Sequence, residues 1–227
     1  MTTSVRAGAD HLARCHRAAR DEGLAPALTV LRALVLPGLL PCGPGGHAVV
    51  PQEVAAGAHR VWLDGVTAAR SADEESAVDS IDLPGGTVVL LRHGTGSRGA
   101  DVHADQRASW SLGLVWLRLG LSEALRETCM RYLNGRRTGS TTVLQQQMVK
   151  SAVADGLIEH LEVRAVLTGA GAGDLPEVVL AHLHTRVTAA DRLLVNLLGA
   201  SGYLTGGPGQ AAHVSELVAE AYVRAES

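Results

Sequence analysis

Phenylalanine is missing from this sequence: its 227 residues include no Phe, and only three Trp and three Tyr supply aromatic bulk. A folded core must therefore be built mainly from Leu, Val and Ala. Binding of single-stranded nucleic acid by stacking needs exposed aromatic faces, and this chain has few to offer. Hydrophobic residues make up 46% of the chain and charged residues 19%, which is typical of a globular protein and not of a disordered one.

Lysine and cysteine are also sparse. Lys150 is the single lysine, and 20 basic against 23 acidic residues give a net charge of −3, which argues against a general nucleic-acid-binding protein. The scattered Cys15, Cys42 and Cys129 fit neither a disulfide framework nor a zinc site and suit a reducing compartment. No apolar run reaches the ~18 residues of a membrane span, and the N-terminus lacks the apolar stretch of a signal peptide. We therefore expect a cytoplasmic protein that binds neither nucleic acid nor a membrane.

Three segments differ in character: an N-terminal helical segment at 1–46, a small β segment with loops at 47–104, and a C-terminal helical bundle at 105–227. Apolar residues at helical spacing predict two helices within residues 3–35. Proline and glycine then cluster at 37–46, which predicts a break in regular structure.

The middle segment carries one strong turn signal. Asp64-Gly65 stands between two short β-prone runs and predicts a hairpin over 59–69. Residues 72–82 are rich in acidic side chains and are expected to be solvated, whereas Thr87 to Leu91 predicts a strand. The segment is too short for an independent sheet domain.

The C-terminal half predicts an antiparallel bundle and a mainly α fold, because long amphipathic stretches are joined by short glycine-containing connections. Four helices are expected, at 105–134, 141–167, 175–198 and 211–224. On the second of them, Glu159 and Glu162 are expected to face arginines such as Arg164, in pairs worth a few tenths of a kcal/mol.

Two motif-like features have ordinary interpretations. Gly94, Gly96 and Gly99 form a G-x-G-x-x-G after a strand, but no second strand and no acidic residue follow as a dinucleotide fold requires, so a flexible loop is expected. His182 and His184 would share a face of a strand but not of the predicted helix. With no further ligand nearby, we interpret them as core-edge or surface histidines, not as a metal site.

Arg136 and Arg137 follow the first bundle helix. Cations are favoured at a helix C-terminus, and guanidinium groups also bind phosphate oxygens in pairs. The residues around Arg136 decide between these interpretations.

Several residues of the bundle stand in a specific order and spacing. Tyr132 precedes Arg136 by four residues, and Gln147 follows Arg136 by eleven. Further along come Ala154-Asp155, the stretch from Asn196 to Tyr203, Pro208 and Tyr222. Together these residues resemble the pattern of the C-terminal domain of the acyl-CoA dehydrogenase family. The likeness covers residues 105–224, with a weaker one at 21–46.

The resemblance implies a flavin site shared between chains. In that family the Arg and Gln reach across a dimer interface to the FAD of a neighbour, and a Gly-Gly segment lets the backbone approach the same cofactor. The residues that this likeness assigns to cofactor binding are Arg136, Gln147, Asn196, Gly199 and Tyr203.

The sequence departs from the family pattern at residues near the flavin and at the positions of the catalytic base. The family's Phe-Gly is Gly139-Ser140 here, and its second Gly is Ala200. The two positions that carry a catalytic base in the family are Val223 and Trp110, neither of which can abstract a proton. The chain is also much shorter than family members, so by itself it is not expected to build a complete flavin site.

Three functions follow from this pattern. The chain could be a reduced, non-base-bearing partner that helps a full-length acyl-CoA dehydrogenase-like chain bind FAD and act on an acyl thioester of CoA or a carrier protein. It could instead be a flavin-independent cyclase, dehydratase or isomerase, with acid–base candidates His103, Asp105, His213 and Glu216. The third alternative is a non-catalytic module for dimerisation. A homodimer or a hetero-oligomer is expected.

Overall fold

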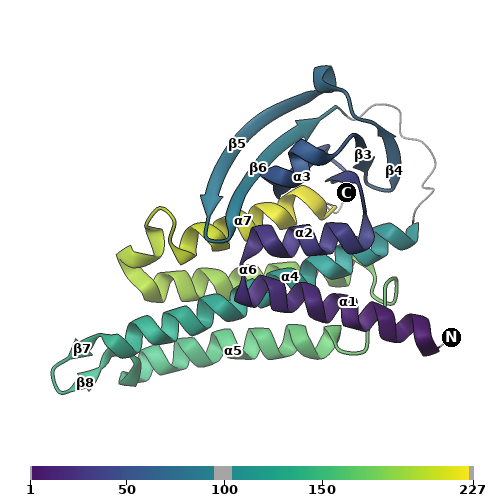
Figure 1. The fold of residues 1–227 in the computed structure, drawn as a ribbon. Helices are drawn as coiled ribbons and strands as arrows, with labels where there is room; N and C mark the ends of the chain where they lie inside the picture. Colours follow the sequence, from purple (N-terminus) through teal and green to yellow (C-terminus); the bar gives the residue numbers. More distant parts are fainter. Residues whose placement is uncertain (1, 95–103, 225–227) are drawn as a thin grey trace.

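Helices dominate the computed structural model of this chain, which describes residues 2–94 and 104–224 (Figure 1). The main ones are α1 (Thr2–Asp21), α2 (Leu24–Val35), α4 (Ala104–Gly135), α5 (Gln147–Leu167), α6 (Glu177–Leu198) and α7 (Pro208–Tyr222). A short helix α3 (Gln52–Gly57) lies among the strands. The expected mainly α fold is confirmed.

The helix expected from residue 141 begins later, at Gln147. The intervening residues form a small hairpin, β7 (Arg137–Thr138) and β8 (Thr141–Thr142), and a 3₁₀ turn η2 (Val143–Gln145). Gly139 turns the hairpin with a φ of 62°, a backbone conformation that favours glycine. The fourth bundle helix starts slightly earlier than expected, because Pro208 occupies a first-turn position where its missing N–H costs nothing.

Helix α4 is the centre of the bundle, contacting α1, α2, α5, α6 and α7. Trp110 and Leu117 pack into a core with α1, α2 and α7, whereas Val115 and Leu119 pack against α5 and α6. Apolar side chains on several faces are what a buried helix requires. Leu, Val and Ala dominate these cores, as the lack of Phe predicts.

Apart from the β7–β8 hairpin, the strands of the described residues form two three-stranded sheets. One has the order β1 (Leu39–Cys42), β3 (Arg60–Leu63), β4 (Val66–Ala69), and the other β2 (His47–Pro51), β6 (Gly86–His93), β5 (Glu75–Leu83). The hairpin expected at Asp64-Gly65 is confirmed: β3 and β4 pair antiparallel, and both turn residues have positive φ.

One expectation for the strands is wrong, and one strand lies where none is predicted. The proline-rich stretch 37–46 contains β1, which pairs in parallel with β3 and tolerates Pro41 because it is an edge strand. The acidic stretch 72–82 is solvated as expected, but most of it is β5, a strand that the sequence does not predict and that pairs with β6 from Glu75 to Leu83. The side chains of β5 are largely exposed, so its sequence shows no alternation of apolar and polar residues. The pairing of β5 therefore depends on backbone hydrogen bonds to β6.

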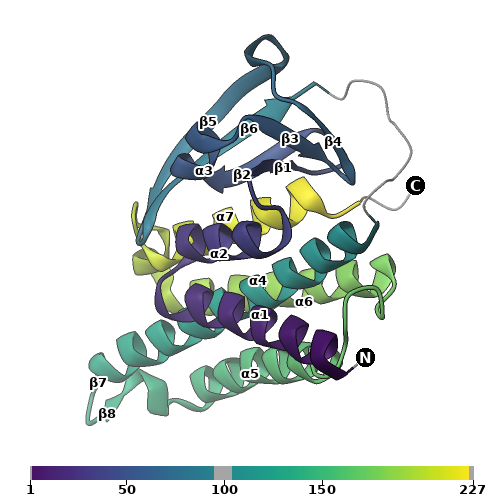
Figure 2. The same ribbon diagram turned by 45° about the vertical axis from the view of Figure 1, so that its right-hand side comes forward.

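The sheets lie over α2 and α7, on the opposite side of these helices from α1 and α5 (Figure 2). Trp110 joins the layers, with its ring centroid 6.3 Å from Trp62 on β3 and 5.4 Å from Tyr222 on α7. The Tyr222 hydroxyl accepts a hydrogen bond from the Val49 N–H at 3.2 Å and lies 3.2 Å from the carbonyl oxygens of Pro41 and Val49, to one of which it donates. The end of α7 is thereby fixed to β1 and β2.

Candidate functional site

The five residues assigned to cofactor binding all belong to segments at one end of the bundle, where α4 and α6 end and α5 begins (Figure 1). Arg136 follows α4, Gln147 begins α5, Asn196 lies in the last turn of α6, and Gly199 and Tyr203 bound the 3₁₀ turn η3 (Gly199–Tyr203). All five are exposed. This end of the bundle therefore presents a cation and amide groups on an open surface.

Tyr132 connects two parts of this surface. The Arg136 guanidinium lies 5.3 Å from the centroid of the Tyr132 ring and donates a hydrogen bond to its hydroxyl oxygen. Ser201 donates to the same oxygen at 2.8 Å. The hydrogen bond from Ser201 lowers the pKa of Tyr132 most, and the hydrogen bond and charge of Arg136 lower it further. Nearby, the Tyr203 hydroxyl donates to the Asn196 side-chain oxygen at 3.0 Å.

Gly199 presents bare backbone at this end. Its φ of 57° favours glycine, and a Cβ added there would meet nothing within 4 Å, so the space in front of it is open. The residues in place of the family's Phe-Gly, Gly139 and Ser140, are exposed in the β7–β8 turn. No aromatic ring can pack at that position.

The two positions that carry the base in the family lie near the C-terminal end of α7, away from the Arg136 surface. Trp110 is buried, and Val223 directly follows Tyr222, whose ring contacts that of Trp110. A cleft of about 240 Å³ opens beside Val223, between the first turns of α4 and α6 and the end of α7. Its wall includes Leu114 and Leu180.

Two ion pairs border this cleft. Arg107 lies 3.9 Å from Glu177, and Arg224 pairs with Asp64 in the β3–β4 turn. His184 on α6 also lines it. A smaller cleft of about 190 Å³ lies beside α1, α4 and α7. None of the five cofactor-binding candidates lines either cleft.

Behind His184, the fully buried Arg118 of α4 makes four hydrogen bonds. Its Nε donates to Ser215 at 3.0 Å, and its Nη2 donates to Thr188 at 2.7 Å. Its Nη1 donates to Nδ1 and to the carbonyl oxygen of His184, at 3.0 and 3.2 Å. Sequence reasoning missed this cluster, although a lone arginine within the leucine-rich stretch 112–121 was a signal for it.

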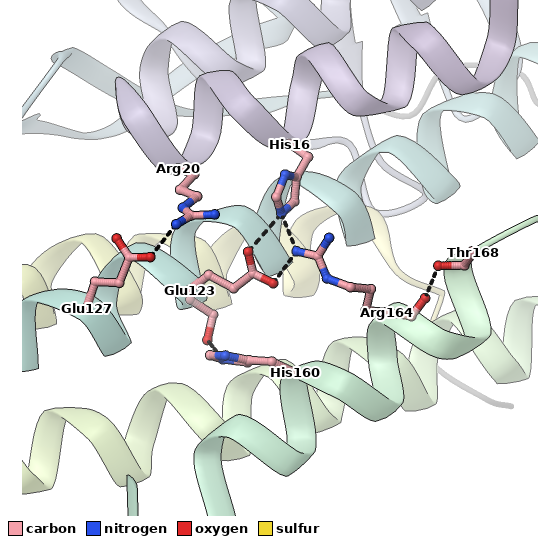
Figure 3. Close-up of polar contacts among 8 residues, drawn as sticks. His16, Arg20, Glu123, Glu127, His160, Arg164 and Thr168 are labelled. Carbon is pink, nitrogen blue, oxygen red and sulfur yellow. Dashed lines mark hydrogen bonds and ion pairs between the residues drawn. The ribbon is translucent and has the colours of Figure 1, made fainter. Parts of the chain in front are cut away.

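A second buried cluster joins three helices. Figure 3 shows Glu123 of α4 between His16 of α1 and Arg164 of α5. Glu123 accepts hydrogen bonds from His16 at 3.0 Å and from Arg164, and these contacts outweigh burial and lower its pKa to about 2. Glu159 and Glu162 face an arginine as expected, but it is Arg186 of α6 and not Arg164.

The acid–base candidates are not brought together. Asp105 and His213 are exposed, Glu216 pairs with Arg192, and none of the three lines either cleft. His103, Gly96 and Gly99 lie outside the described residues, and Gly94 follows β6.

His182 is exposed and His184 is buried, both on α6. Within residues 2–94 and 104–224, no three His, Cys, Asp or Glu side chains are grouped to hold a metal ion. In the same ranges, no helix is long and apolar enough to cross a membrane.

Comparison with solved structures identifies the fold. The ChsE4-ChsE5 complex from Mycobacterium tuberculosis contains a chain that aligns with 94% of this one, at a TM-score of 0.65 and 18% identity. The chain has an acyl-CoA dehydrogenase-like fold. A Tcur3481-Tcur3483 steroid ACAD variant aligns over 92% of this chain at a TM-score of 0.59 and 17% identity.

The present chain spans only part of these structures: 77% of the first neighbour and 69% of the second. It spans 56% of a glutaryl-CoA dehydrogenase from Mycobacterium smegmatis in complex with FADH2, which aligns over 80% of this chain at a TM-score of 0.51 and 15% identity. No family model and no curated protein sequence matches the chain.

Proposed function

We propose that this chain is a reduced, non-base-bearing subunit of a heteromeric acyl-CoA dehydrogenase-like flavoenzyme, acting with a full-length partner on an acyl thioester. The observation that carries the proposal is the open surface around Arg136. The five cofactor-binding candidates are exposed and line neither of the two clefts described above, so we expect a second surface to complete the site.

The residues on this surface fit one half of FAD. The exposed Arg136, ordered by Tyr132, suits a diphosphate, since guanidinium groups bind phosphate oxygens with charge-assisted hydrogen bonds. Gln147 and Asn196 offer amide groups for the adenosine part, and open space in front of Gly199 allows close approach of a ligand to the backbone. The isoalloxazine half has no counterpart at Gly139-Ser140.

In the proposed complex the flavin supplies the oxidising chemistry, and the partner supplies the base that Val223 and Trp110 cannot. Arg136 neutralises and orients the diphosphate. Two of the solved neighbours carry paired chain names, ChsE4-ChsE5 and Tcur3481-Tcur3483, and a third is described with FADH2. These likenesses support the proposal by analogy of fold.

Co-purification tests it. The chain would be expressed alone and together with a candidate full-length acyl-CoA dehydrogenase-like chain, and bound flavin would be measured from the visible spectrum. We expect no flavin on the chain alone and a yellow complex of both. Arg136→Gln should weaken FAD binding to the complex about tenfold, because a charge-assisted hydrogen bond is lost, whereas Arg131→Gln on the exposed surface of α4 should not.

Each alternative predicts a different result. Flavin retained by the chain alone would contradict the reduced-partner role. A stable homodimer that never binds such a partner would favour the dimerisation module, and turnover of a thioester without flavin would favour the flavin-independent enzyme. Equal FAD affinity in Arg136→Gln and the unaltered complex would remove Arg136 from the site.

A further inference from the structure

His184 is held in one tautomer by the buried Arg118. Arginine carries hydrogen-bond donors only, so the Arg118 Nη1 that lies 3.0 Å from His184 Nδ1 must donate to it. Nδ1 is then an acceptor, and the ring proton belongs on Nε2. The Arg118 guanidinium is held in turn by Ser215 and Thr188, which fixes the direction of this donor.

The imidazole is also kept neutral. Burial, and then the charge of Arg118, lower the pKa of His184 well below its ordinary value. Only 4% of the residue is exposed. His184 therefore presents a neutral N–H donor over the physiological pH range, not a cation or a proton-accepting base.

This donor has no partner within the described residues. The ring lines the 240 Å³ cleft, and because Nδ1 is turned to Arg118, Nε2–H is the polar group that the ring can offer to a ligand. A ligand oxygen that accepts from this N–H would gain a hydrogen bond at the wall of the cleft.

The rest of the cleft indicates which ligand carries that oxygen. Leu114, Leu180 and Val223 contribute an apolar wall. Among the residues that the structure describes, the charged ones at its border form two ion pairs, Arg107 with Glu177 and Arg224 with Asp64, whose formal charges cancel. The cleft therefore favours neither an anion nor a cation.

We propose that this cleft binds a small, uncharged, largely apolar molecule through one carbonyl oxygen, which accepts a hydrogen bond from Nε2–H of His184. The inference does not depend on whether the chain handles flavin. It assigns a role to a histidine that the sequence alone marks as ordinary.

Binding would be measured on the whole chain by NMR titration with three probes of similar size: cyclohexanone, methylenecyclohexane and cyclohexanecarboxylate. We expect cyclohexanone to bind best and to shift signals of residues in the cleft. Replacing His184 with Leu should weaken cyclohexanone binding about fivefold, which is the worth of one hydrogen bond. The same change should leave methylenecyclohexane binding unaltered.

Three further variants control for damage to the fold. His184→Gln retains an oxygen for Arg118 and an N–H for the ligand and should keep most of the affinity. His182→Leu, on the exposed face two residues away, should bind like the unaltered chain. Ala181→Leu fills the cleft without touching the donor and should weaken both uncharged probes.

A direct readout of the tautomer does not depend on any variant. Long-range ¹H–¹⁵N spectra should show His184 protonated at Nε2 and not at Nδ1. The proposal is overturned if the proton is on Nδ1, if methylenecyclohexane binds as tightly as cyclohexanone, if the carboxylate binds best, or if no probe in the millimolar range shifts residues of the cleft.

Discussion

His16 and Glu123 form a buried hydrogen bond of 3.0 Å across 107 residues of sequence, which ties α1 to the central helix. The same carboxylate accepts from Arg164 of α5, so a single acidic side chain links three helices (Figure 3). Breaking a buried pair by removing one partner leaves the other groups uncompensated, which makes Glu123 a sensitive position.

Glu123→Gln should lower the free energy of unfolding by about 2 kcal/mol at pH 7, measured by urea denaturation. The pKa of Glu123 is lowered to about 2, so its contribution is present above the unfolded value near 4.5 and is lost as pH falls toward 2. The difference between the unaltered chain and Glu123→Gln should therefore shrink between pH 4.5 and pH 2.

Glu127→Gln is the matched control, because Glu127 pairs with Arg20 one turn along on the same two helices but is exposed. It should cost less than about 1 kcal/mol and show little dependence on pH in this range. Equal losses in the two variants would mean that the Glu123 cluster contributes no more than a surface pair.

Asp191 gives the opposite dependence on pH. It is buried on α6, and burial raises its pKa to about 7 even though Ser122 and the charge of Arg118 favour the carboxylate. Between pH 3.8 and 7 the folded chain binds a proton that the unfolded chain has lost, so this residue makes stability fall as pH rises.

Asp191→Asn replaces the carboxyl with a neutral group of the same shape. It should raise the free energy of unfolding at pH 8 by on the order of 2 kcal/mol, with a smaller gain at pH 5, in urea denaturation at both pH values. A gain independent of pH would show that Asp191 does not titrate in the folded chain.

The helices could be predicted from the sequence because their signals are local. Apolar residues three and four apart mark α4 and α6 within a few residues, and Asp64-Gly65 marks the hairpin between β3 and β4. β1 and β5 escaped prediction because both are edge strands, and their pairing depends on the backbone of β3 and β6 and not on an apolar alternation.

The candidate site also has a part that the sequence predicts and a part that it does not. Arg136 and its neighbours could be proposed from spacing along the chain, and the structure reports where they lie. The contact of Arg118 with His184 joins positions 66 residues apart, and no pattern reveals which ring nitrogen faces the guanidinium. The position of Arg118 in a leucine-rich helix predicts that its guanidinium needs buried partners, but it does not predict which residues these are.

Tyr222→Phe should test how α7 is held to the strands. The change keeps the ring against Trp110 but removes the hydroxyl that contacts the Val49 N–H and the carbonyl oxygens of β1 and β2. We expect a loss of about 1–2 kcal/mol in urea denaturation, since a buried N–H is left without a partner. Tyr203→Phe, at an exposed hydroxyl, should cost less than about 0.5 kcal/mol, and equal losses would argue against the tie.

Gly120→Ala should separate α1 from α4. A Cβ at Gly120 would lie 2.5 Å from the His16 carbonyl oxygen, which is backbone and cannot turn aside. Alanine inside a helix otherwise stabilises it by up to ~1 kcal/mol, so a loss of about 2–3 kcal/mol in thermal or urea unfolding would come from this contact.

Gly156→Ala on α5 is the matched control, because its Cβ would meet Leu194 at an ordinary 3.5 Å. That variant should be neutral or slightly stabilising. Because His16 also donates to Glu123, displacement of α1 by Gly120→Ala should weaken this hydrogen bond as well. The double variant Gly120→Ala with Glu123→Gln should then lose less than the sum of the single losses, whereas full additivity would mean that α1 keeps its place.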